Sequence, residues 1–329
     1  MCKILIFLFL ISLGLSIILG LIFIPIFKKI KFRQSILSYV EEHKHKSGTA
    51  TMGGLFFISV AIIICLLFVK GENSLTKFSL SICFAYTLVG FLDDFIKIKY
   101  KRNLGLRPYQ KIIFQVSIAV VCSLYAYRNG LTLLFIPFTK FKINVGAWII
   151  PLVIVVFLAT TNTVNLTDGL DGLAGSVSCI YLLFTSLIVA LQISNNSQIY
   201  LIDTEYYNLI KVSVIFAGAI LGFLLFNTYK ASVFMGDTGS LGLGGIIASI
   251  SILTGNMLFI LFLGICFVLS GLSVIIQVIY FKITKGKRIF LMAPLHHHFQ
   301  HKGYSESKIV FAYCLLTTIM GLICICVYL

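Results

Sequence analysis

Ten long apolar runs divide this chain, and they constrain its fold more than any other feature of the sequence. A helix needs roughly 20 apolar residues to cross a bilayer. Of the 329 residues 59% are hydrophobic and only 11% are charged, whereas a soluble domain carries about 25% charged residues. We therefore expect an all-α polytopic membrane protein, one integral membrane domain over residues 1–329. The expected spans lie near 4–27, 52–70, 77–96, 108–127, 147–165, 173–192, 209–227, 239–254, 257–281 and 308–329.

Three local patterns refine this expectation. The apolar part of residues 1–29 is longer than a signal-peptide core and no A-x-A-like site follows it, so we interpret it as a retained first span. The eighth run is short and rich in glycine, which favours close helix packing. Residues 138–148 alternate apolar and polar side chains, which predicts a short outer-face β-hairpin. The nine cysteines lie in apolar runs without C-x-x-C spacing, so we expect small buried side chains rather than disulfides or zinc ligands.

The basic residues predict the orientation of the helices. With ten spans, 19 of the 26 lysines and arginines fall on one side of the membrane. The positive-inside rule makes that side cytoplasmic. Both termini are then expected outside.

Two adjacent aspartates, Asp93 and Asp94, end the third apolar run in the sequence FLDDF. A carboxylate in a lipid-facing helix costs about 2.5–3.5 kcal/mol, and two neighbours repel each other. Five of the six aspartates and all six histidines fall in the same predicted cytoplasmic layer. Collection of charge at an interface explains the lysines, but it gives no reason to concentrate acids there.

A second polar segment joins the fifth and sixth runs. Residues 160–174 place Asn162, Asn165, Asp168 and Asp171 at steps of three, with glycines after both aspartates. Residues three apart share a helix face, and the glycines indicate that the helix breaks. The spacing is not that of an EF-hand. An ordinary polar turn between two spans is the alternative interpretation.

A third segment, Phe234–Ser240, carries Asp237 at an expected helix start. Helix capping is its simplest role. A capping carboxylate can also bind metal, and Mg²⁺ prefers one or two carboxylates together with substrate phosphates.

A fourth segment, 290–308, contains three consecutive histidines, His296, His297 and His298. Histidine-rich tracts often bind metal, but three in a row cannot all face one ion from a regular element. Between lysines and near aspartates, we favour hydrogen bonding to phosphate. Carboxylates for Mg²⁺ beside lysine, amide and imidazole groups are what phosphoryl transfer requires, because its transition state is stabilised by positioning and charge. The membrane setting predicts a lipid substrate.

Six motifs resemble those of the phospho-N-acetylmuramoyl-pentapeptide transferase family, within the polyprenyl-phosphate sugar-1-phosphate transferases. They are KSGTATMGG (46–54), FLDDF (91–95), GLRPYQK (105–111), NTVNLTDGLDGLAG (162–175), VFMGDTGSLGLGG (233–245) and MAPLHHHFQHKGY (292–304). The resemblance implies transfer of phospho-N-acetylmuramoyl-pentapeptide from its UDP-activated form to undecaprenyl phosphate, giving lipid I and UMP, with Mg²⁺ as cofactor. It also implies a bacterial inner-membrane location, a cytoplasm-facing site, no nucleic-acid partner and, as a family expectation, a homodimer.

The same resemblance implies roles for individual residues. Asp237 matches the Mg²⁺ ligand. Asp93, with Asp94 beside it, matches the residue that activates the lipid phosphate, and His296 is the fourth expected catalytic residue. Positions expected around the uridine are Lys46, Leu170, Asp171, Asn227 and Phe234. Other expected pocket residues are Asn162, Asn165, Asp168, Gln277, His297 and His298, and those near the phosphates are Thr51, Lys101 and Lys111.

The chain departs from the family pattern at a few positions. Ala50 and Lys230 replace prolines, and Gln300 replaces the acid after H-H-H-F. None of these changes removes an expected ligand.

Three other functions are compatible with parts of the sequence. A sister enzyme that transfers N-acetylglucosamine-1-phosphate would share the aspartate motifs but not the triple histidine. A transporter would place its carboxylates near the bilayer midplane, commonly between inverted repeats, and no repeat is visible. A lipid-binding scaffold would not need Asp93, Asp94 and Asp237 together.

Overall fold

A computed structural model describes residues 2–29, 49–69, 74–100, 104–195 and 202–329. Lys46 and Lys101, both expected near the substrate, lie outside these ranges. Within them the chain is a helical bundle, and nine helices are long and apolar enough to cross a membrane. The all-α polytopic expectation is confirmed. In chain order, the spans that match the first five apolar runs are α1 (Cys2–Lys29), α2 (Gly54–Phe68), α3 (Ser74–Lys99), α4 (Pro108–Arg128) and α5 (Ile149–Thr167).

The second half of the bundle follows the remaining five runs. Its helices are α6 (Leu173–Ser194), α7 (Ile202–Asn227), α8 (Gly236–Leu253), α10 (Ile265–Ile283) and α12 (Glu306–Cys326). Every predicted run therefore contains a helix, although α2, with 15 residues, is shorter than the nine spans. Among the described elements, the ninth run is broken near Gly264 into η3 (Met257–Phe259), α9 (Ile260–Leu263) and α10.

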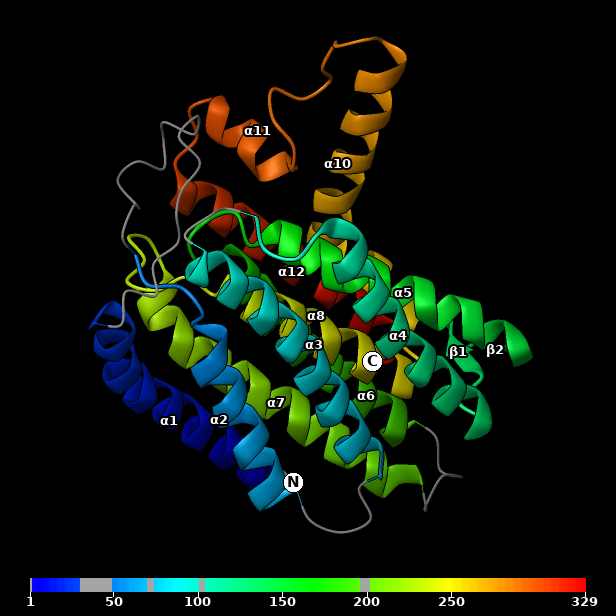
Figure 1. The fold of residues 1–329 in the computed structure, drawn as a ribbon. Helices are drawn as coiled ribbons and strands as arrows, with labels where there is room; N and C mark the ends of the chain where they lie inside the picture. Colours follow the sequence, from blue (N-terminus) through cyan, green and yellow to red (C-terminus); the bar gives the residue numbers. More distant parts are fainter. Residues whose placement is uncertain (1, 30–48, 70–73, 101–103, 196–201) are drawn as a thin grey trace.

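The glycine-rich helix α8 lies inside the bundle. It packs against α3, α5 and α2, while α1 lies along α7, and α6 packs against α7 and α12 (Figure 1). Close approach requires glycine at two of these contacts. A Cβ on Gly90 of α3 would overlap the backbone of Asp237, and one on Gly54 of α2 would overlap Gly239. The glycines thus hold the start of α8 directly against α2 and α3.

The helix α10 extends beyond the rest of the bundle, and a loop returns from its end to the short helix α11 (Leu295–His301), as Figure 1 shows. Its outer half exposes a row of apolar side chains, including Ile275, Ile279 and Ile283. The triple histidine lies on α11, a separate short helix at the end of the bundle.

The predicted hairpin is present but begins earlier than expected. Strand β1 (Leu133–Phe135) pairs antiparallel with β2 (Lys142–Asn144), and Leu133 lies opposite Asn144. The expected range, 138–148, includes only the second strand. The first strand was missed because its sequence, LLF, continues an apolar stretch. Phe135 donates its backbone N–H to Gly255 O, and this bond connects the hairpin to the end of α8. All nine cysteines are free and most are buried, as expected.

Candidate functional site

Three aspartates meet where the end of α3 faces the start of α8. Asp93 and Asp94 belong to the last turns of α3, and Asp237 belongs to the first turn of α8. One carboxylate oxygen from each lies within 4.8 Å of the others. Asp93 and Asp94 are almost completely buried, with 3% and 4% of their surface exposed. This donor set fits a hard divalent cation, which takes carboxylate oxygens as ligands.

Lys97 lies at the centre of these carboxylates. Its Nζ is 2.6 Å from Asp93 Oδ2, 3.0 Å from Asp237 Oδ2 and 3.8 Å from Asp94 Oδ1. Sequence reasoning did not select it as a site residue. The available signal was its position three and four residues after the aspartates on one helix, which places all three side chains on one face.

Backbone and hydroxyl donors fix the orientation of the paired aspartates. Leu106 donates its N–H to Asp93 Oδ1 at 2.9 Å. Thr238 donates both its backbone N–H and its hydroxyl to Asp94 Oδ2, at 2.9 and 2.7 Å. Since Thr238 follows Asp237, the bond joins the two halves of the acidic cluster. Asp94 is therefore held by Thr238, whereas Asp93 binds Leu106 and shares Lys97 with Asp237.

Two predicted pocket residues bind the third aspartate. Lys111, in the first turn of α4, places its Nζ 2.9 Å from Asp237 Oδ2. Asn165, near the end of α5, donates its side-chain N–H to Asp237 Oδ1 at 2.8 Å and to Ser240 Oγ at 2.7 Å. Both residues lie in the acidic cluster, so its two lysines and one amide come from three different helices.

The turn between α5 and α6 carries two more predicted acids. Burial, followed by the charges of Asp237, Asp94 and Asp171, raises the pKa of Asp168 well above its ordinary value. Asp171 accepts a hydrogen bond from Ala231 N–H at 3.1 Å through Oδ2. Its own N–H approaches Glu306 Oε2 at 3.4 Å. Asp171 thus connects this turn to the loop before α8 and to α12.

Phe234, expected near the uridine, lies where two segments run side by side. Phe234 donates its N–H to Ala50 O at 2.7 Å and accepts from Gly53 N–H at 2.9 Å. Asn227, buried at the end of α7, donates to Val233 O at 2.9 Å. Leu170 is a buried core residue. Thr51 is also buried, and its Oγ1 lies beside Gly236, close to Asp94 Oδ2.

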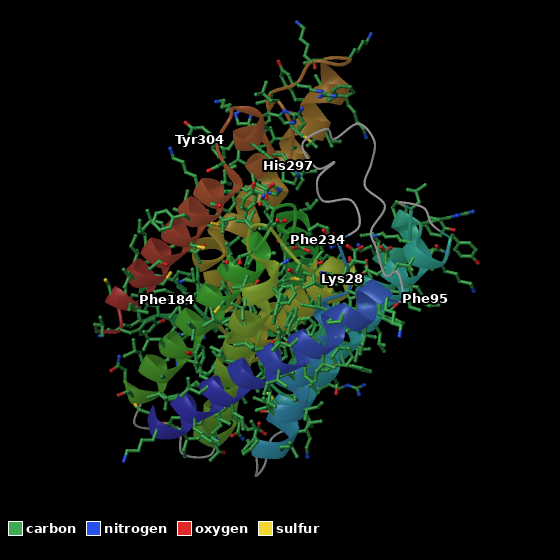
Figure 2. The ribbon with its side chains drawn as sticks, turned by 90° about the vertical axis from the view of Figure 1, so that its left-hand side faces the viewer. Lys28, Phe95, Phe184, Phe234, His297 and Tyr304 are labelled. Carbon is green, nitrogen blue, oxygen red and sulfur yellow. The ribbon has the colours of Figure 1, made fainter. Side chains whose placement is uncertain are left out.

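The three histidines of α11 do not share one direction: His296 and His297 bring Nε2 to Gly169 in the α5–α6 turn, whereas His298 faces Leu291. His296 is fully buried, and its ring centroid lies 4.4 Å from that of His297. A Cβ at Gly169 would overlap His296 Nε2, so the glycine lets the α5–α6 turn approach the histidines. His298 accepts a hydrogen bond from Leu291 N–H, and burial lowers its pKa. Figure 2 shows His297 and Phe234 in the same region of the molecule.

Two further predicted pocket residues bind neighbouring parts of the protein. Asn162 exchanges hydrogen bonds with Gln115 of α4, at 2.7 and 3.4 Å. Gln277 accepts from Ile289 and Phe290 N–H and donates to Phe290 O, closing the loop after α10. Among the described residues the structure thus brings most of the predicted set to one end of the bundle, with Asn162 and Gln277 turned to their own neighbours.

Similarity to known proteins agrees with this geometry. Residues 75–255 match the glycosyl transferase family 4 profile. A phospho-N-acetylmuramoyl-pentapeptide-transferase of Clostridium botulinum (strain Eklund 17B / Type B) is 46% identical over 312 residues, which cover 94% of this chain and 91% of the relative. One of Clostridioides difficile (strain 630) is 43% identical over 96% of this chain and 95% of the relative.

The chain belongs to the phospho-N-acetylmuramoyl-pentapeptide-transferase family. It is therefore an integral membrane enzyme of a transferase family, and the resemblance of its six motifs is confirmed over nearly the whole chain. The matched profile ends at 255, so it includes the three aspartates but not α11.

Proposed function

We propose that this protein transfers phospho-N-acetylmuramoyl-pentapeptide from UDP to undecaprenyl phosphate, forming lipid I and releasing UMP. The observation that carries the proposal is the contact of Asp93, Asp94 and Asp237 with Lys97 and Lys111 at one end of a membrane-spanning bundle. Charge of both signs is needed there because the reaction joins one phosphate to another. The names of the relatives supply the substrate.

The donor set of the acidic cluster fits Mg²⁺, with Asp237 as the proposed ligand and Asp93 and Asp94 beside it. Bound there, Mg²⁺ would neutralise charge on the nucleotide diphosphate and polarise its oxygens.

The chain's own groups divide the remaining work. Lys97 and Lys111 offer ammonium groups to phosphate oxygens, since both already bind carboxylates at this point. Asp93 is buried, with Oδ1 held by Leu106 N–H and Oδ2 by Lys97, so its carboxylate has a fixed position for the proposed approach of the lipid phosphate. Asn165 fixes the rotamer of Asp237. Each group therefore keeps its position before substrate binds, which lowers the cost of organising the transition state.

We also propose an orientation in the membrane that lets both substrates reach the acidic cluster. We propose a single domain in the bacterial inner membrane, with the acidic cluster at the cytoplasmic face and both termini outside. The basic loops that predict this orientation adjoin the ends of α1, α3 and α10. Lys28 and Phe95, near the ends of α1 and α3, lie toward the same end of the bundle in Figure 2. A homodimer, expected from the resemblance, is testable by mass measurement in detergent.

The test is lipid-dependent release of UMP by the purified protein with Mg²⁺. UDP-N-acetylmuramoyl-pentapeptide and UDP-N-acetylglucosamine are supplied separately, and Asp237→Asn is the control. Product from the muramoyl substrate alone is the expected result. Product only from the glucosamine substrate would assign the chain to the sister reaction, and no lipid-dependent product from folded protein would refute transfer altogether.

Residue roles are tested in the same assay. Asp93→Asn should reduce kcat more than nucleotide affinity, because its proposed role is in the chemical step. A change confined to KM would remove that role. His296→Ala should slow the reaction, and an unchanged rate would make the histidine structural.

A further inference from the structure

Gln300 connects the triple histidine to α12. Its Oε1 lies 3.0 Å from His297 Nδ1, and its Nε2 lies 3.4 Å from Glu306 Oε1. Glu306 is the first residue of α12 and also approaches the backbone N–H of Asp171. The three side chains thus form a row from the α11 helix to the turn between α5 and α6.

The chemistry of the row determines the direction of its hydrogen bonds. A carboxylate can only accept, whereas an amide has one accepting oxygen and one donating nitrogen. Glu306 therefore selects the NH₂ end of Gln300 and turns the amide oxygen toward His297. The His297 Nδ1 must then donate, so this nitrogen carries a proton. Reversing the amide would place its oxygen against the carboxylate, which is repulsive.

A proton on Nδ1 determines what the other ring nitrogen offers. In a neutral imidazole one nitrogen donates and the other accepts. With Nδ1 protonated, Nε2 is the acceptor. This atom points toward the turn between α5 and α6, because a Cβ at Gly169 would lie 3.0 Å from it. Gly169 is flanked by Asp168 and Leu170, both expected in the pocket.

We propose that Gln300 and Glu306 are positioning residues that hold neutral His297 as its Nδ1–H tautomer and present Nε2 as a hydrogen-bond acceptor. The proposal rests on the proposed function, and it assigns His297 to a substrate N–H or O–H group of the sugar-peptide. A phosphate oxygen needs a donor, and the one N–H of the neutral ring is bonded to Gln300, so Nε2 does not serve the diphosphate.

The neutral amide at position 300 also affects the charge of the ring. An acid at 300 would place a negative charge on Nδ1 and favour the charged imidazolium, which donates from both nitrogens. A neutral amide keeps the hydrogen bond without that charge. The titratable groups on the described elements beside the ring are His296, His298 and His301 on α11, with the His296 centroid 4.4 Å away. The α5–α6 turn carries Asp168 and Asp171, and Glu306 begins α12.

Nitrogen-15 spectra of protein labelled at its six histidines test the proposal without requiring turnover. The His297 signals are assigned by their loss in His297→Gln. At a pH where the ring is neutral, we expect Nδ1 to be protonated and Nε2 to be the acceptor in the natural protein. Gln300→Leu should lose this preference. Glu306→Gln should weaken it, because the Gln300 amide can then turn over.

A second variant keeps the test valid if Gln300→Leu does not fold. Gln300→Glu has the same shape and should raise the midpoint of His297 titration by about 1 pH unit or more. Glu205→Gln is the matched control, since Glu205 accepts from Ser74 N–H and hydroxyl at the start of α3, far along the chain from α11. It should leave the His297 signals unchanged.

Two results would overturn the proposal. One is a proton on Nε2 of neutral His297 in the natural protein. The other is an unchanged His297 midpoint in Gln300→Glu. Because the spectra do not depend on UMP release, failure of the transferase assay would leave the tautomer result standing, and the two proposals fail separately.

Discussion

Replacing Lys97 with methionine tests the electrostatic account of the acidic cluster. Methionine keeps the apolar stem and removes the charge that lies 2.6–3.8 Å from three carboxylates. At an effective dielectric of about 20, one such pair 3 Å apart interacts by about 5 kcal/mol. Desolvation offsets much of this, and removing one partner of a buried ion pair costs about 3–5 kcal/mol. Lys97 is 23% exposed on its side chain, so we expect about 3 kcal/mol.

This loss converts to a measurable change in melting temperature. Unfolding entropy of about 2.1 cal/mol/K per residue gives roughly 0.7 kcal/mol/K for a chain of this length, so Lys97→Met should melt about 4 °C lower in EDTA. Buried cysteines make a thiol-reactive dye a suitable probe of unfolding in detergent. Mg²⁺ should return most of the loss, because a bound cation replaces the missing charge.

The matched control is Lys99→Met, which removes an exposed lysine of the same helix whose charge lies over the Tyr100 ring. It should leave the melting temperature unchanged within about 1 °C. An equal loss for Lys97→Met in EDTA and in Mg²⁺ would refute the reasoning, since the lysine would then not share a site with the cation.

Three further predictions follow from single contacts. Gly169→Ala should reduce the UMP-release rate at least tenfold with little change in melting temperature, because its methyl group overlaps His296 Nε2. An unchanged rate would show that the close approach of the α5–α6 turn to His296 is not needed for the reaction. Asp168→Asn should match the natural protein in stability at low pH and exceed it at high pH in EDTA, since the native pKa of Asp168 is raised and the stability it contributes is lost as pH rises through that pKa; parallel melting curves from pH 5 to 9 would contradict this. Gln277→Leu should release the loop after α10 and speed tryptic cleavage at Arg288, measured by mass spectrometry of the fragments. Equal cleavage rates in the variant and the natural protein would show that the amide does not hold the loop.

The helices could be predicted from the sequence because lipid forces each apolar run to satisfy its own backbone. The start of α8 was expected near Asp237, and the proximity of Asp93 and Asp237 followed from placing both at the same end of the bundle. These inferences need only the order of the runs and their direction. The motifs of the sequence do not predict the break at Gly264, because the apolar pattern continues through it.

Packing between helices determines the partners of several side chains, including Lys97, which sequence reasoning missed. Lys97 was counted among interfacial lysines, although its spacing from Asp93 could have selected it. Gln277 was expected in the pocket, but its amide satisfies backbone groups 12 and 13 residues away. Asn162 similarly bonds to Gln115 of another helix. Such partners are set by side-chain direction, which spacing alone does not determine.

Helix α8 has 89% of its span covered by protein, whereas α1 has 22%. A change in bilayer thickness therefore acts first on lipid-exposed helices such as α1, α4 and α12. These helices can tilt, or the bilayer can thin around them, at a modest cost in free energy. Asp237 is carried by a helix with almost no lipid boundary of its own. A change in the bilayer therefore reaches Asp237 through the helices around α8 rather than through direct lipid contact.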